Sequence, residues 1–151
     1  MKKRKKKPEL RCHCGCGTVV RPAKDVYKDV INGDEFLITC SRYPVCDSYV
    51  GVHKGTLLPK GTLANGDLRH WRILAHRAFD CIWQNKVMTR TNAYGWIRDK
   101  FCLKEKQGHI GYFTEYMCMQ LIGECTKVLG NNGLKLPESI IHDELFIRLA
   151  S

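Results

Sequence analysis

Two clusters of cysteines near the N-terminus constrain this chain more than any other feature. Residues 11–20 read RCHCGCGTVV, and residues 36–46 read FLITCSRYPVC. The thiols in these two runs belong to Cys12, Cys14, Cys16, Cys40 and Cys46. A zinc ion takes four ligands in a tetrahedron, and thiolates are its usual ligands in structural sites. We therefore expect a zinc site formed by Cys40, Cys46 and two of the first three thiols, with His13 as a substitute for one of them.

The segment between the two clusters predicts a β-hairpin. Residues 18–20 favour a short strand, and residues 25–31 alternate in the manner of a second strand. Asn32-Gly33 is a strong hairpin-turn signal because both residues adopt positive φ readily. Residues 35–40 then predict the strand that returns to the first cluster. So short a segment buries little apolar surface, and zinc binding supplies about 10 kcal/mol or more of folding free energy in such modules.

One run in this segment resembles a known family. The sequence Phe36 to Cys46 is similar to the C-S-x-Y-P-x-C knuckle in the C-terminal zinc ribbons of type IA DNA topoisomerases. The resemblance implies a zinc ribbon that binds single-stranded DNA. The chain departs from that pattern in its first knuckle, which is CHCGCG in place of C-P-x-C-G, and in a Phe-to-Cys spacing that is one residue longer.

A second resemblance covers residues 12–125. The series CDSYVGVHKGT, PKGTLAN, LRHWRILAHRAFDCIW, RTNAYGW and HIGYF is similar to the zinc-finger-containing proteins of phages and prophages. This resemblance implies a zinc-binding protein of a phage or prophage and says little about chemistry.

The first eleven residues carry six of the ten net positive charges of the chain. Six consecutive cations repel one another and Pro8 follows them, so residues 1–10 predict a disordered arm. Such an arm favours contact with phosphates. The cations that we expect to make these contacts are Lys2, Lys3, Arg4, Lys5, Lys6 and Lys7.

The cysteine count and the hydropathy pattern indicate the compartment. Nine cysteines, an odd number with five of them clustered, favour metal binding over a disulfide framework. No apolar run suggests a signal peptide or a membrane span. We therefore expect a cytoplasmic protein, in the host cytoplasm if the chain is phage-encoded.

The second half of the chain predicts helices. Residues 54–67 are rich in Gly and Pro and predict a linker, with Asn65 or Asp67 as the N-cap of a helix over 68–85. Further helices are expected over 92–102 with Thr91 as the cap, over 115–129 with Thr114 as the cap, and over 138–149 after Pro137. The predicted fold is a small α+β protein: a zinc ribbon over 11–53, then a helical domain of three to four helices over 68–151.

A polar line runs along the helix expected over 68–85. Arg69, Arg72, His76 and Asp80 fall on one side of it at helical spacing. The two arginines can hold a nucleic-acid backbone, or the line can be a solvated or salt-bridged helix face. His76 and Asp80 can form a polar network, and His76 can act as a base with Asp80 and His109 in a nuclease-type enzyme.

The remaining cysteines and the tryptophans are expected in the core. Cys81, Cys102, Cys118 and Cys125 have no knuckle spacing, so they predict buried thiols. Trp71, Trp83 and Trp96 are expected first as core residues and second as platforms for bases.

These features together favour a zinc-dependent nucleic-acid-binding protein. The ribbon is expected to stack bases through Tyr43, Tyr49 or Arg42, on single-stranded DNA or on structure-tolerant targets that include RNA. The alternative is an adaptor or inhibitor that binds a host or phage protein through the helical domain. A nuclease-type enzyme is a third hypothesis, and the lack of paired carboxylates at metal-binding spacing counts against its two-metal form.

Overall fold

The computed structural model describes residues 10–27 and 35–150. It divides the chain into two compact units, the first ending at Gly66 and the second running from Asp67 to Ser151. Each unit has a hydrophobic core of its own.

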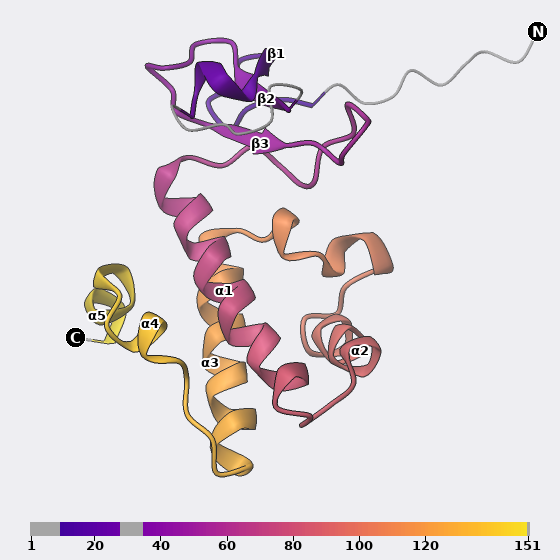
Figure 1. Cartoon of the computed structure of the whole chain (residues 1–151), viewed down its shortest axis with the longest axis vertical. Helices are drawn as coiled ribbons and strands as arrows, with labels where there is room; N and C mark the ends of the chain where they lie inside the picture. Colours follow the sequence, from indigo (N-terminus) through magenta and orange to yellow (C-terminus); the bar gives the residue numbers. More distant parts are fainter. Residues whose placement is uncertain (1–9, 28–34, 151) are drawn as a thin grey trace, which may run out of the picture. The chain divides into compact units, whose positions relative to one another are not determined.

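The first unit contains a three-stranded antiparallel sheet in the order β1-β2-β3 (Figure 1). The strands are β1, Thr18–Pro22, β2, Phe36–Cys40, and β3, Tyr49–Gly51. Thr18 pairs with Cys40, and Ile38 pairs with both Val20 and Val50. Because side chains alternate along a strand, the side of the sheet that carries Ile38 and Cys40 faces the core. The buried residues of this core are Cys12, Ile38, Cys40, Val50 and Leu63.

The partner of β2 differs from the sequence prediction. The short predicted strand at 18–20 extends to Pro22 and pairs directly with β2. Asp25 lies in a 3-10 helix, η1 (Ala23–Asp25), which turns the chain so that Val26 and Tyr27 donate to the carbonyl of Ala23. The strand predicted over 25–31 is therefore wrong at its start, and its remainder, with the Asn32-Gly33 turn, lies outside the described residues.

The segment over 54–67, predicted as a linker, contains two residues that form β-bridges within the first unit. Val52 forms a β-bridge with Pro59, and Tyr49 forms one with Ala64. Leu63 and Ala64 are almost completely buried. The outer edge of β3 is therefore covered by the chain's own later segment.

The second unit consists of helices around one core. The helices are α1, Gly66–Gln84, α2, Arg90–Lys100, α3, Glu115–Asn131, α4, Glu138–Ile141, and α5, Glu144–Ala150, with 3-10 helices η2, Glu105–Gly108, and η3, Ile110–Tyr112. Figure 1 shows α1 and α3 side by side, and both contribute buried residues to the core. The predicted apolar stripe of α1 is buried as expected: Leu68, Trp71, Ala75, Phe79 and Ile82.

Two helix ends differ from the sequence prediction. Helix α2 begins two residues earlier than expected, because the hydroxyl of Thr89, and not that of Thr91, accepts the backbone N–H of Asn92 at 3.2 Å. The predicted last helix is split into α4 and α5. Asp143 causes the split, since its Oδ1 accepts the N–H of Leu145 at 3.0 Å and starts a new helix. The cap at Thr114 is as predicted, with Met117 donating at 3.2 Å.

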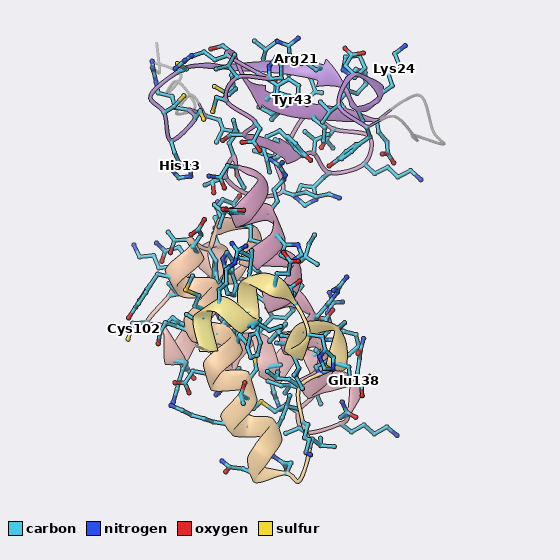
Figure 2. The ribbon with its side chains drawn as sticks, turned by 90° about the vertical axis from the view of Figure 1, so that its left-hand side faces the viewer. His13, Arg21, Lys24, Tyr43, Cys102 and Glu138 are labelled. Atoms are coloured by element: carbon cyan, nitrogen blue, oxygen red, sulfur yellow. The ribbon has the colours of Figure 1, made fainter. Side chains whose placement is uncertain are left out.

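Three of the four remaining cysteines are in the core or against it. Cys118 and Cys125 are fully buried and Cys81 packs against the core. Cys102 is exposed, which corrects the prediction: it follows the end of α2 with a φ of 53° and projects from the second unit (Figure 2). Burial raises the pKa of the Cys118 thiol to about 12, so it stays protonated near neutral pH.

The three tryptophans all belong to the second unit. Trp71 is buried, and Trp83 and Trp96 pack partly buried against the core. Within the described residues, no helix combines the length and the apolarity that a membrane crossing requires.

Candidate metal centre

Four thiols converge at one end of the sheet. The sulfur atoms of Cys12, Cys14, Cys40 and Cys46 all lie within 4.8 Å of one another. The Cys12 and Cys46 sulfurs are 3.6 Å apart, and the Cys14 and Cys40 sulfurs are 3.5 Å apart. A tetrahedral zinc ion with Zn–S bonds of about 2.3 Å requires sulfur–sulfur separations of about 3.8 Å. The four thiols therefore fit a single Zn²⁺.

The first knuckle contributes Cys12 and Cys14, so Cys16 is outside the cluster. Gly15 has a φ of 88°, a conformation that favours glycine, and its N–H donates to the carbonyl of Cys12 at 2.9 Å. This turn lets the N–H of Cys12 donate to the carbonyl of Cys16 at 3.0 Å. Cys16 is half-buried against the apolar core of the first unit. His13, labelled in Figure 2, is exposed and is not part of the thiol cluster. His53 is exposed and is also outside the cluster.

The second knuckle holds its two sulfurs with local donors. The backbone N–H of Arg42 lowers the pKa of Cys40, but burial and the three neighbouring thiols outweigh it and raise that pKa to about 12. Cys46 Sγ lies 3.5 Å from the hydroxyl of buried Ser48. The hydroxyl and N–H of Ser48 lower the pKa of Cys46 to about 6.

The opposite pKa shifts of Cys40 and Cys46 indicate that the four thiols need a cation to ionise together. One thiol ionises easily, but each further thiolate meets the negative charge already present in the cluster. A bound divalent cation removes this repulsion and deprotonates all four ligands. Four sulfur ligands leave no open coordination position, so the metal stabilises the fold and does not activate water.

A closed four-thiolate centre beside a three-stranded antiparallel sheet defines the class of zinc-ribbon proteins. The chain belongs to the family of the zinc-finger-containing domain, whose family model matches residues 8–128. The chain has no significant match among curated proteins or among solved structures.

The predicted base-stacking residues lie on the first unit. Arg42 is exposed, and Tyr43 and Tyr49 are half-buried. Tyr43 and Tyr49 contact each other edge to face, with ring centroids 6.4 Å apart. The predicted phosphate contacts of Lys2 to Lys7 lie outside the described residues.

Two residues that the sequence analysis did not single out, Tyr27 and Arg21, lie near these tyrosines. Tyr27 packs edge to face against Tyr49 with centroids 5.8 Å apart. Arg21 donates from Nε to the hydroxyl of Thr39 at 3.0 Å, and Thr39 pairs with Tyr49 across β2 and β3. By the strand register, Arg21, Thr39 and Tyr49 share the side of the sheet opposite the core. The alternation of residues 18–22 could have indicated the side of the sheet on which Arg21 lies. The position of Tyr27 depends on the turn made by η1, which the sequence pattern does not show.

The residues of the polar line predicted on α1 differ in their burial. Arg72 is buried and its Nε donates to the carbonyl of Phe113 at 3.0 Å. This burial disfavours the predicted phosphate contact, because the guanidinium bonds the turn before α3. Arg69 is half-buried and interacts within the protein.

Asp80 and His76 lie on the same line of α1. Asp80 accepts the indole N–H of Trp83 at 3.1 Å, so its carboxylate orients that ring. The pKa of His76 is lowered by partial desolvation, while the charge of Asp80 raises it and that of Arg72 lowers it further. His109, the third residue of the nuclease hypothesis, faces the ring of Tyr94 at 6.1 Å.

Proposed function

We propose that the zinc ribbon binds single-stranded nucleic acid on the sheet side that carries three tyrosines. The observation that carries this proposal is the row Tyr27–Tyr49–Tyr43, in which each outer ring packs edge to face on the central one. Bases of a single strand stack on aromatic rings of any orientation that leaves a ring face accessible. The zinc centre supports the row because Tyr43 follows Cys40 by three residues, and Tyr49, the first residue of β3, follows Cys46 by three residues.

Positive charge on the first unit supports the same proposal. Arg21 donates to the hydroxyl of Thr39, which pairs with the central tyrosine, Tyr49, across the sheet. Arg42 is exposed and directly precedes Tyr43. Cations outnumber acids among the described residues of this unit; the cations are Arg11, Arg21, Lys24, Arg42, Lys54 and Lys60, and the acids are Asp25, Glu35 and Asp47. The similarity of residues 36–46 to the single-strand-binding ribbons of type IA topoisomerases adds to this support.

The test is fluorescence anisotropy with a labelled 12-nucleotide single strand and the zinc-loaded chain. Loss of one stacked base costs about 1–3 kcal/mol, so Tyr43→Ala should weaken binding by roughly that amount. Tyr116→Ala is the matched control, because Tyr116 is an exposed tyrosine of the second unit. Equal affinities of Tyr43→Ala and Tyr116→Ala, at equal zinc content, would contradict the proposal.

The salt dependence tests the role of the basic arm. The slope of log K against log salt concentration should decrease by about 0.7 for each cation removed from contact with a single strand. Deletion of residues 2–7 is therefore expected to flatten the slope without changing the effect of Tyr43→Ala. Parallel titrations with RNA and duplex DNA identify the preferred polymer, and the absence of binding to all three would refute the function.

A protein-binding role of the second unit is the second proposal. It is supported by exposed apolar side chains on the two C-terminal helices, Ile141, Ile147 and Leu149. A pull-down after nuclease treatment should return one stoichiometric protein that Ile147→Lys no longer captures. Unchanged capture by that variant would contradict this role.

A further inference from the structure

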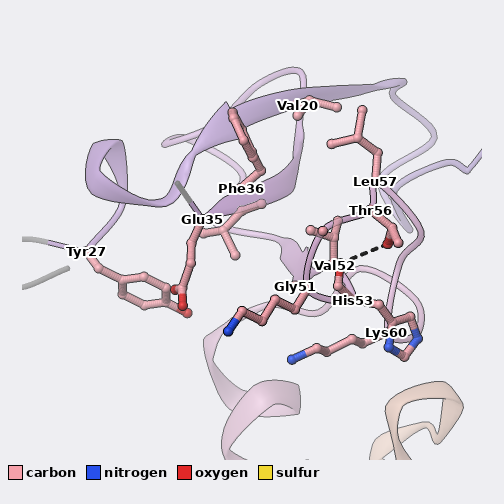
Figure 3. A pocket seen from close by; sticks show the side chains of 13 residues that line it. Val20, Tyr27, Glu35, Phe36, Gly51, Val52, His53, Thr56, Leu57 and Lys60 are labelled. Carbon is pink, nitrogen blue, oxygen red and sulfur yellow. Dashed lines mark hydrogen bonds between the residues drawn. The ribbon is translucent and has the colours of Figure 1, made fainter. Parts of the chain in front are cut away.

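The first unit contains a pocket that lies beside the tyrosine row. Its volume is about 1020 Å³, and it is formed by the end of the sheet, by Tyr27 and by the loop over 53–60 (Figure 3). Ligand pockets commonly measure roughly 300–1000 Å³, so this pocket has room for a nucleotide. Tyr27 belongs both to the pocket and to the row, so the two meet at this one residue.

One part of the pocket lining is apolar and includes an aromatic ring. Val20, Phe36 and Leu57 line it, and all three are exposed, with 46%, 41% and 58% of their surface accessible. Val20 and Phe36 project from the core side of β1 and β2, beyond the end of the buried core. This lining offers a flat apolar ligand a surface on which to pack.

A second part of the lining is cationic and held by an ordered loop. The N–H of His53 donates to the carbonyl of Leu58 at 2.9 Å, and the hydroxyl of Thr56 donates to the carbonyl of His53 at 2.8 Å. The loop carries Lys54, and Lys60 follows it with its N–H bonded to the carbonyl of Gly51 at 2.9 Å. The aliphatic part of the Lys60 side chain packs next to Gly51: a β-carbon added at Gly51 would lie 3.7 Å from Cδ of Lys60.

We infer that this pocket binds one nucleotide unit, with the base against Phe36 and the phosphate at Lys54 and Lys60. An inorganic anion would use only the lysines, and a purely apolar ligand would use only the opposite lining. A nucleotide combines a flat ring with a negative charge and uses both. This inference rests on the proposed function, because a strand stacked on the tyrosine row reaches the pocket at Tyr27.

Glu35 gives the pocket a preference among bases. Its carboxylate lines the same end of the pocket as Tyr27 in Figure 3. An ionised carboxylate only accepts hydrogen bonds, so it selects a base edge that donates. Guanine presents two adjacent donors, N1–H and N2–H, whereas uracil presents one. GMP is therefore the expected best mononucleotide probe.

The test is calorimetric titration of the zinc-loaded full chain with GMP. The double variant Lys54→Gln/Lys60→Gln should weaken GMP binding at least tenfold. The matched control is Lys104→Gln/Lys106→Gln, which removes two exposed lysines of the second unit and should bind GMP like the wild type. Inorganic phosphate should bind at least tenfold more weakly than GMP. Equal binding by the two double variants, or by phosphate and GMP, would overturn the inference.

Titrations with GMP and with the 12-nucleotide strand distinguish this inference from the proposed function. GMP should compete with the 12-nucleotide strand, and Glu35→Gln should reduce the preference for GMP over UMP. If the strand binds through Tyr43 but GMP neither binds nor competes, the pocket inference is wrong and the function stands. If GMP binds through the two lysines and no strand binds, the function is wrong and the pocket stands.

Discussion

Cys14 and Cys16 are two positions apart, and only Cys14 faces the other three clustered thiols. Cys14→Ser removes one of four zinc ligands, so the zinc content should fall well below one ion per chain. Cys16→Ser should retain one zinc ion, because Cys16 packs against the apolar core and does not reach the cluster. Metal analysis of the two purified variants compares them directly. Loss of zinc from Cys16→Ser would show that the ligand set is different.

Ser48 acts on the metal centre through Cys46. Its hydroxyl and N–H both lower the pKa of that thiol, so they stabilise the thiolate that zinc requires. Removal of such a supporting donor typically lowers metal affinity about 10- to 100-fold. We expect Ser48→Ala to weaken zinc binding toward the lower end of that range in a chelator competition assay. Ser41→Ala, at an exposed position next to Cys40, is the control and should bind zinc normally.

Asp143 links the C-terminal helices to α1. Its Oδ2 lies 2.5 Å from Nε2 of His70, and its Oδ1 accepts the N–H of Leu145. Burial raises the pKa of this carboxyl, but the hydrogen bonds from His70 and Leu145 outweigh it and lower the pKa below its ordinary value. The unfolded chain therefore takes up this proton at a higher pH than the folded chain does. The stabilisation is present above the ordinary carboxyl pKa of about 4 and is lost as pH falls through the lower folded-state value.

Two substitutions of Asp143 test whether this carboxylate contributes stability that is lost in acid. Asp143→Asn can still accept the N–H of Leu145, so it should remove part of the acid-induced loss of stability between pH 5 and 2. Asp143→Ala also removes the helix cap and should cost about 1 kcal/mol at pH 7. Urea unfolding followed by tryptophan fluorescence measures both. A wild-type acid profile in Asp143→Asn would contradict the assignment.

At the scale of the elements, the start of α2 depends on Thr89. Its hydroxyl caps the helix, whereas Thr91 lies within the first turn and is exposed. Thr89→Ala should therefore lower the free energy of unfolding by about 1 kcal/mol. Thr91→Ala should change it little, since alanine is the better helix former. A larger loss in Thr91→Ala than in Thr89→Ala would instead favour the cap that the sequence predicts.

The elements also show what the sequence could and could not predict. The helical spacing of Trp71, Ala75 and Phe79 is a local property, so α1 and its buried side could be predicted. The pairing of β1 with β2 could not, because it depends on η1 turning the chain after Pro22, and the alternation of residues 25–31 competed for the same partner. The break at Asp143 was missed because a side-chain acceptor for Leu145 has no signature in apolar periodicity.

The metal centre was predictable in kind but not in detail. Four thiols and zinc follow from the spacing of the two clusters alone. The choice of Cys14 over Cys16 depends on the positive φ of Gly15, which the letters CHCGCG do not reveal. The burial of Arg72 likewise depends on the position of the Phe113 carbonyl, 41 residues further along the chain.

At the scale of the whole molecule, the two units should respond differently to metal removal. Among the described residues of the first unit, the core cluster has five buried members, and two of them belong to the thiol cluster. Chelation should therefore unfold this unit, since structural zinc contributes about 10–16 kcal/mol in small modules. The second unit has a larger core and all three tryptophans. Tryptophan emission should stay unchanged while amide resonances of β1, β2 and β3 collapse. A simultaneous red shift of the tryptophans would show that the units unfold together.

The ligands of the metal centre come from a short stretch near the start of the chain, and the unit around them ends at Gly66. During synthesis on a ribosome, every atom that the ion contacts emerges before most of the helices have been translated. Metal acquisition can therefore precede completion of the polypeptide. The first unit can then fold around its ion while the second unit is still being made.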